Sequence, residues 1–123
     1  MRPRVDARSR GEIWEARAAE LLRENGIRIV AQRYRCRLGE LDIIGADGSA
    51  LVIIEVRARG GRDAAIETIG IDKRRRIVNA TRHFLMQNPE WSSHRIRFDV
   101  VAIDHIDSDE PEIRWVRNAF DAA

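Results

Sequence analysis

The chain has 123 residues, a length suited to one domain with a substantial hydrophobic core. Apolar residues make up 44%, charged residues 34%, and the formal net charge is +2, a balance that excludes an intrinsically disordered chain. The only cysteine, Cys36, excludes an internal disulfide and a cysteine-based zinc site, and no stretch approaches the roughly 20 apolar residues of a membrane-spanning helix.

The N-terminal segment, residues 1–10, is rich in arginine and lacks the hydrophobic stretch of a secretory signal. We therefore expect a cytoplasmic protein without a membrane partner, in which a flexible basic arm precedes a single domain over residues 11–123. Residues 11–25 predict an amphipathic helix, because apolar side chains recur at helical spacing, and Gly26 ends it. A first strand is expected over residues 27–33.

Two apolar segments that carry acidic residues come next. Residues 39–44 and 51–57 have the length and the β-branched composition of buried strands. Asp47-Gly48 between them is a strong turn signal, so we expect the two strands to form a hairpin. Gly60-Gly61 breaks the second of these strands.

The remaining elements are a helix and one or two strands. A second helix is expected over residues 72–87, where Asn88-Pro89 ends it. A fourth strand is expected over residues 95–103, and a last short strand over residues 113–116. The order helix, three strands, helix, strand is typical of an α/β domain with a mixed sheet.

Two further acidic features lie in the C-terminal part. Asp99 shares a strand face with Arg97, so the simplest expectation is an ion pair between them. The acidic stretch 104–112 is too irregular for a calcium loop and predicts an exposed turn.

Asp42 and Glu55 are the most informative acids, because they interrupt buried strands. Strand side chains alternate between the two faces of a sheet, so the hairpin sets Asp42 and Glu55 near one another on one side. Like charges so close do not both ionise unless a cation compensates them or one pKa rises. Carboxylate oxygens are ligands that suit Mg²⁺ or Mn²⁺. These two acids therefore indicate a divalent metal site.

The first helix adds a third candidate acid. At about 100° per residue, Glu15 lies at the border of the apolar stripe, near Ala18 and Leu22, so it can reach the sheet that the helix covers. Two interpretations stay open here. Glu15 either joins the acidic site or forms an ion pair with Arg57 or Arg59.

Basic residues gather near the same elements, and arginine supplies all but one of them. Because planar guanidinium groups bind phosphate through two hydrogen bonds, these clusters favour a nucleic-acid partner. The alternative is a solvated surface that reflects a bias toward arginine. The candidate nucleic-acid contacts are Arg35, Arg37, Arg59, Lys73 and Arg74.

Beyond these single features, longer stretches match a known pattern. They are Gly11 to Gly26 with Glu15 and Ala18, the run GELDII at 39–44, LVIIEVRAR at 51–59, Lys73, and RFDVV at 97–101. Together they resemble the YraN family (UPF0102), small bacterial proteins of the PD-(D/E)XK, or restriction-endonuclease-like, superfamily. Members of that superfamily are similar to archaeal Holliday-junction resolvases.

The resemblance implies a restriction-endonuclease-like αβββαβ core and a metal-dependent endonuclease that acts on DNA rather than RNA. Carried over by position, it makes Asp42 and Glu55 metal ligands and Glu15 the helical acid of the site. Arg57 then takes the place of the motif lysine, and Lys73 becomes a phosphate contact. Because resolvase-like proteins often act in pairs, it also raises the expectation of a homodimer.

Two positions depart from the family pattern. Arginine stays protonated in proteins, so Arg57 could stabilise a transition state but could not act as a base. Trp14 stands beside Glu15 where a small residue is expected, and it could crowd the site.

Three functional hypotheses follow. The leading one is a nuclease that uses Mg²⁺ or Mn²⁺ to hydrolyse DNA, with branched or otherwise structured DNA as the candidate substrate. The second is a non-catalytic nucleic-acid-binding module of the same fold, which Arg57 favours. The third is a protein-interaction domain in which the acids and arginines form a buried structural network.

Overall fold

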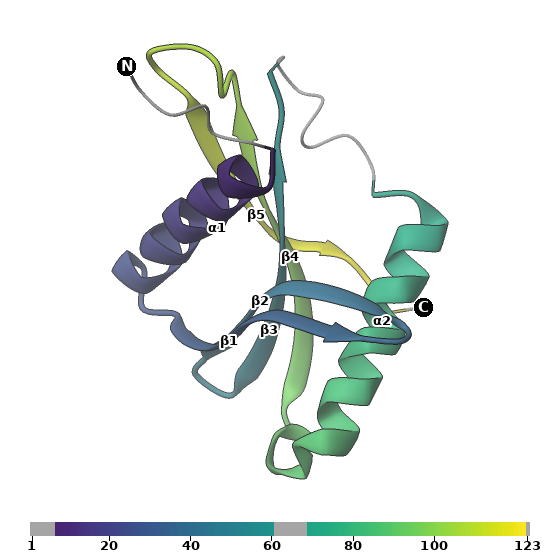
Figure 1. Ribbon diagram of the computed structural model, residues 1–123. Coiled ribbons are helices and arrows are strands. Elements are labelled where there is room, and N and C mark those ends of the chain that lie inside the picture. Colours follow the sequence, from purple (N-terminus) through teal and green to yellow (C-terminus); the bar gives the residue numbers. More distant parts are fainter. Residues whose placement is uncertain (1–6, 61–68, 123) are drawn as a thin grey trace.

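The computed structural model describes residues 7–60 and 69–122, with side chains described from residue 11 onward. Residues 1–6 of the expected N-terminal arm therefore lie outside the described residues, as does Gly61. Figure 1 shows the elements in the order α1 (Ala7–Glu24), β1 (Arg28–Cys36), β2 (Gly39–Asp47), β3 (Ala50–Ala58), α2 (Ile71–Gln87), the 3₁₀ turn η1 (Pro89–Trp91), β4 (Arg95–Asp104) and β5 (Glu112–Phe120). No helix among the described residues is long and apolar enough to cross a membrane.

The strands form one mixed sheet in the order β1-β2-β3-β4-β5. β3 and β4 pair in parallel, and the other three neighbouring pairs are antiparallel. A parallel pair needs a crossover connection, and α2 lies in the chain between β3 and β4. This mixed α/β sheet confirms the expected fold class and is consistent with a restriction-endonuclease-like core.

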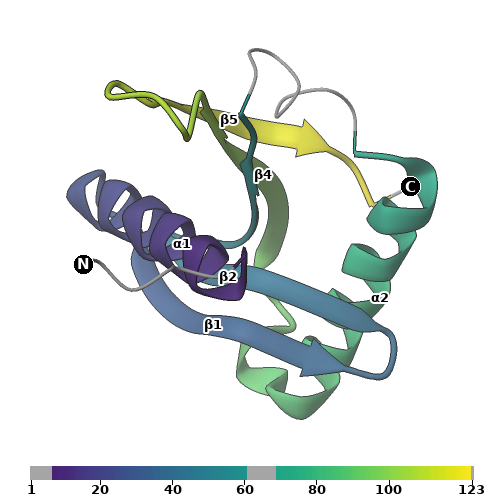
Figure 2. The same cartoon turned by 45° about the horizontal axis from the view of Figure 1, so that its top comes forward.

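The two helices cover opposite faces of the sheet (Figures 1 and 2). Side chains of β3 alternate between the two layers: Leu51 and Ile53 pack with the apolar face of α2, whereas Val52 and Ile54 pack with that of α1. All four are at most 2% exposed. Because β3 is buried on both faces, the carboxylate of Glu55, the next residue along the strand, is also largely removed from water.

The first helix and the last strand of the chain are longer than the sequence predicts. α1 begins at Ala7, four residues before the expected start, because its first turn carries no apolar stripe to signal a helix. It ends as predicted at Gly26, which adopts a φ of 85°. β5 runs to Phe120 rather than residue 116, because pairing with β4 continues to the contact of Phe120 with Phe98. That contact is stacked, with ring centroids 4.9 Å apart.

The acidic stretch after β4 is only partly the exposed turn that the sequence predicts. Residues 107–110 are exposed, but Asp104 is fully buried at the end of β4 and forms an ion pair with Arg114 of β5. The prediction is therefore wrong for Asp104, because it belongs to the β4–β5 pair and not to the loop.

Candidate functional site

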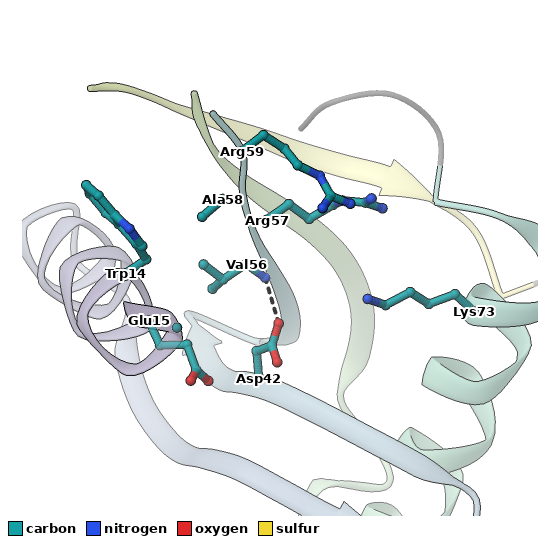
Figure 3. A pocket seen from close by; sticks show the side chains of 9 residues that line it. Trp14, Glu15, Asp42, Val56, Arg57, Ala58, Arg59 and Lys73 are labelled. Atoms are coloured by element: carbon teal, nitrogen blue, oxygen red, sulfur yellow. Dashed lines mark hydrogen bonds between the residues drawn. The ribbon is translucent and has the colours of Figure 1, made fainter. Parts of the chain in front are cut away.

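A pocket of about 310 Å³ opens between α1, the C-terminal end of β3 and the start of α2 (Figure 3). Figure 3 shows Asp42 between Glu15 on the α1 side and Lys73 on the α2 side. Several residues predicted for the site thus come together from four elements that are distant in the sequence. The pocket is lined by Gly11, Trp14, Glu15, Asp42, Val56, Arg57, Ala58, Arg59 and Lys73.

Asp42 and Glu55 meet where the β2–β3 ladder ends. The ladder runs from Asp47 opposite Ala50 to Ile43 opposite Ile54, so the next pair in that register is Asp42 with Glu55. At that point the backbone N–H of Val56 donates a hydrogen bond to Oδ2 of Asp42 at 2.8 Å. The side chain of Glu55 is 8% exposed. The hairpin therefore delivers two carboxylates to one largely buried place.

The pKa of Asp42 is raised from its ordinary value to about 8. Burial is the largest cause, and the negative charge of Glu55 is the next, while the hydrogen bond from Val56 works in the opposite direction. Without a cation between the two carboxylates, Asp42 holds its proton near neutral pH. This is the electrostatic situation that a bound divalent cation relieves.

Lys73, the single lysine of the chain, reaches Glu55 from the first turn of α2. Its Nζ lies 2.6 Å from Oε1 of Glu55, and its side chain is 45% exposed. The sequence predicts Lys73 as a phosphate contact, and the structure places its ammonium group both at the pocket and on an acid of the site. In this structure Lys73 compensates the charge of Glu55.

Glu15 faces the pocket but is held by an arginine that the sequence did not indicate. Nε of Arg33 donates to Oε2 of Glu15 at 3.1 Å, and the same guanidinium pairs with Glu12 at 3.2 Å. The expected alternative partners, Arg57 and Arg59, are therefore wrong. Arg33 has a φ of 54°, and the β1–β2 register shifts between Ile29 and Ala31, so face alternation along β1 does not locate its side chain.

Burial is also the leading cause of a raised pKa at Glu15, ahead of the opposing effect of Arg33. The second carboxylate oxygen, Oε1, is buried and has no hydrogen-bond partner within the described part of the chain. A buried acceptor without a partner is costly, so this oxygen is poised for a water molecule or a ligand.

The predicted nucleic-acid contacts separate into two groups. Arg59 and Lys73 line the pocket, and so does Arg57, the residue at the position of the motif lysine. The guanidinium ends of Arg57 and Arg59 point toward the Lys73 side (Figure 3). The others lie outside its lining. Arg35 pairs with Glu40 at 3.2 Å, and Arg37 is exposed in the turn after β1. Arg74 donates to the carbonyl of Ile69 at 2.8 Å and lies over the ring of Phe120.

The acidic side chains of the site can be compared with the ligands that the expected metal ion needs. Within residues 7–60 and 69–122, no group of three or more histidine, cysteine, aspartate or glutamate side chains is placed to hold a metal ion. Mg²⁺ needs fewer, because it binds through one or two carboxylates and keeps several waters. Asp42 and Glu55 fit that requirement, whereas a ligand set that also includes Glu15 is not assembled in this structure.

A sequence model of the uncharacterised protein family UPF0102 matches residues 14–103. The chain is 42% identical over 113 residues to a UPF0102 protein of Pseudomonas fluorescens, a match that covers 88% of this chain and 89% of the relative. It is 40% identical over 115 residues to a UPF0102 protein of Legionella pneumophila, covering 92% and 95% of the two chains. A UPF0102 protein of Pseudomonas aeruginosa is 38% identical over 125 residues, covering 99% and 100%.

Proposed function

We propose that this chain, which belongs to the uncharacterised protein family UPF0102, is a metal-dependent nuclease that hydrolyses phosphodiester bonds in DNA. One observation carries the proposal. Asp42 lines a pocket together with three cationic side chains, Arg57, Arg59 and Lys73. Glu55 interacts with Asp42 and Lys73 and lines an adjoining pocket that shares these two residues. Paired acids next to phosphate-binding cations are the residue types that metal-assisted phosphodiester hydrolysis requires.

Asp42 and Glu55 are the side chains that would hold Mg²⁺ or Mn²⁺. A divalent ion bound there activates water and neutralises charge that develops on the phosphate. The chain prepares this place through burial, which is the largest cause of the raised pKa of Asp42, followed by the negative charge of Glu55. When no metal ion is bound, Lys73 balances the charge of Glu55.

The cations of the pocket bind and orient the phosphate. Arg57 keeps its charge at every relevant pH, so its contribution is electrostatic stabilisation and not proton transfer. Arg59, the residue just after the end of β3, lines the same pocket and offers a second guanidinium to the adjoining backbone of the DNA. Glu15 presents its unpartnered Oε1 to the site and can orient a water molecule by accepting a hydrogen bond.

Branched or otherwise structured DNA is the substrate class we propose, which rests on the similarity to Holliday-junction resolvases. The test uses labelled linear duplex, single-stranded, flap and four-way-junction DNA with Mg²⁺, Mn²⁺ or EDTA. We expect metal-dependent cutting that falls by about a hundredfold or more in Glu55→Gln and Asp42→Asn. Glu20→Gln is the matched control, because Glu20 is an exposed acid on α1 whose side chain is 64% exposed.

Wild-type rates in both Glu55→Gln and Asp42→Asn would contradict the proposal. Cutting that persists in EDTA would contradict its metal dependence. Because all variants are purified in the same way, a contaminating nuclease would appear equally in each preparation.

The second candidate is a nucleic-acid-binding module of the same fold that does not cut DNA. Arg57 favours it, because an arginine cannot take a proton from water. Such a module binds DNA with a steep salt dependence in every metal and without product. Asp42→Asn would then bind no more weakly than wild type, since it removes an acid and not a phosphate contact. Binding without cutting therefore selects this function.

A further inference from the structure

We infer that Trp14 is a stacking platform for an unpaired nucleobase, so that the pocket favours DNA whose bases are unpaired next to the bound phosphate. The inference rests on the proposed function and names its substrate more closely. Trp14 lies on α1 immediately before Glu15, and it lines the same pocket as Asp42. Figure 3 shows its ring at the α1 side of the pocket, beside Ala58.

The three tryptophans of the chain differ in what occupies their rings. The indole N–H of Trp115 donates to Asp99 at 2.9 Å, and Arg117 lies 3.8 Å from its ring centroid. Trp91 has the ring of His94 at 4.8 Å and the guanidinium of Arg28 at 5.5 Å. Trp14 has neither a hydrogen bond nor a ring contact within the described part of the chain. It is half-buried, and part of it packs against the apolar layer under α1.

The surroundings of Trp14 leave room for a flat ligand. Gly11, three residues earlier on α1, is also part of the lining. Apart from its chain neighbours and the helix backbone, no atom of the described residues lies within 4 Å of the place where its side chain would begin. Trp14 and Gly11 are three residues apart on α1, so they lie on the same side of the helix and both border the pocket.

The opposite side of the pocket supplies the complementary chemistry. Arg57, Arg59 and Lys73 are cationic and suit the phosphodiester backbone, whereas Trp14 is the one aromatic residue in the lining. Single-stranded nucleic acid is bound by this combination, in which cations follow the backbone and aromatic rings stack on bases. A base in an intact duplex is already stacked and paired, so it cannot occupy the platform without being extruded.

The experiment measures DNA binding in EDTA, so that metal-dependent cutting does not degrade the DNA while its affinity is measured. Fluorescence anisotropy compares a perfect duplex, a single strand, a duplex with one bulged base, and the same bulge made abasic. For wild type we expect tighter binding to the bulged base than to its abasic form. Trp14→Ala should weaken binding to the single strand and the base bulge by about fivefold or more, while duplex affinity changes by less than about twofold.

Three further variants separate stacking from folding. Trp14→Phe keeps an aromatic face and should retain most of the affinity for the bulge. Gly11→Leu leaves the tryptophan in place but fills the open space beside it, so it should lower the same affinity. Trp91→Phe, a tryptophan outside the pocket lining, is the matched control and should bind as wild type. Melting temperatures verify that each variant is folded.

Equal affinity of wild type for the base bulge and the abasic bulge would overturn the inference. So would undiminished binding of the bulge by both Trp14→Ala and Gly11→Leu. Either result would leave the proposed nuclease intact if metal-dependent cutting still requires Glu55. Wild type that binds none of the DNA probes would overturn both proposals together.

Discussion

Two aspartates of the sheet, Asp99 and Asp42, have opposite environments. Asp99 of β4 is fully buried, and four donors satisfy it: Nε and a terminal nitrogen of Arg97, the indole N–H of Trp115 and the backbone N–H of Asn118. Asp42 receives one backbone hydrogen bond and faces Glu55, so its pKa rises to about 8. The first acid is paired and holds β4 and β5 together, whereas the second lies against another acid. Both residues are aspartates, so residue type does not distinguish a structural acid from a candidate site acid. The number of hydrogen-bond donors around each carboxylate does distinguish them.

The largest effect that we expect from this comparison is on stability at Asp99. Asp99→Ala leaves Arg97 and Trp115 without their buried acceptor, which should lower the free energy of unfolding by about 3–5 kcal/mol. Asp42→Ala should cost far less, because it removes a buried carboxylate that another acid repels. Urea denaturation of both variants measures the difference. If Asp42→Ala is as costly as Asp99→Ala, the acids of the pocket form a structural network and the comparison fails.

The second expectation concerns the missing cation. In EDTA the ammonium group of Lys73 lies on Glu55 and no divalent ion is bound. Because the proposed ion binds the folded chain, adding Mn²⁺ or Mg²⁺ should stabilise the folded protein by about 2.7 kcal/mol at a concentration 100 times the dissociation constant. Melting temperature recorded against metal concentration measures this effect. Asp42→Asn and Glu55→Gln should remove the shift, and Glu20→Gln should retain it. A shift that survives in both site variants would place the metal elsewhere.

The third expectation is a pH dependence with a definite sign. The pKa of Asp42 is raised by folding, from an ordinary 3.8 to about 8, so the folded chain binds this proton more tightly than the unfolded chain does. The stability that this proton contributes is complete below about pH 4 and is lost as the pH rises toward 8. Wild type in EDTA should therefore lose about 2 kcal/mol or more across this range relative to Asp42→Asn. Equal slopes in the two proteins would show that Asp42 ionises normally.

The sequence predicts contacts between site residues that are close in the chain better than contacts between residues that are far apart in the chain. Asp47-Gly48 and the alternation along β2 and β3 are local signals, so the hairpin and the approach of Asp42 to Glu55 follow from them. The contact of Lys73 with Glu55 depends on how α2 packs over the sheet, which no local pattern specifies. Asp104 and Arg114 show the same limit, because their pairing is set by the β4–β5 register.

Arg33 illustrates a second reason why part of the site escapes prediction. Its positive φ and the nearby shift in register turn its guanidinium toward Glu12 and Glu15. Face alternation assumes regular strand dihedrals, and it fails at such a residue. The sequence therefore predicts a partner of Glu15 on or next to β3, although the partner, Arg33, lies on β1.

The smallest effect that we expect comes from Arg57, and it tests whether this arginine limits the rate at which the acids of the pocket and their metal cut DNA. A lysine at this position can lose a proton when it is buried, whereas arginine cannot. Arg57→Lys should therefore raise the rate of metal-dependent cutting by about tenfold under single-turnover conditions, with a steeper dependence on pH. Arg23→Lys is the matched control, because it makes the same exchange at an exposed arginine of α1 outside the pocket lining and should change the rate by less than about twofold. A slower Arg57→Lys would instead show that the two-pronged grip of the guanidinium on phosphate outweighs proton transfer. In that case the chain would depend on its acids and their metal to activate water, and its nearly complete replacement of lysine by arginine would carry no catalytic penalty.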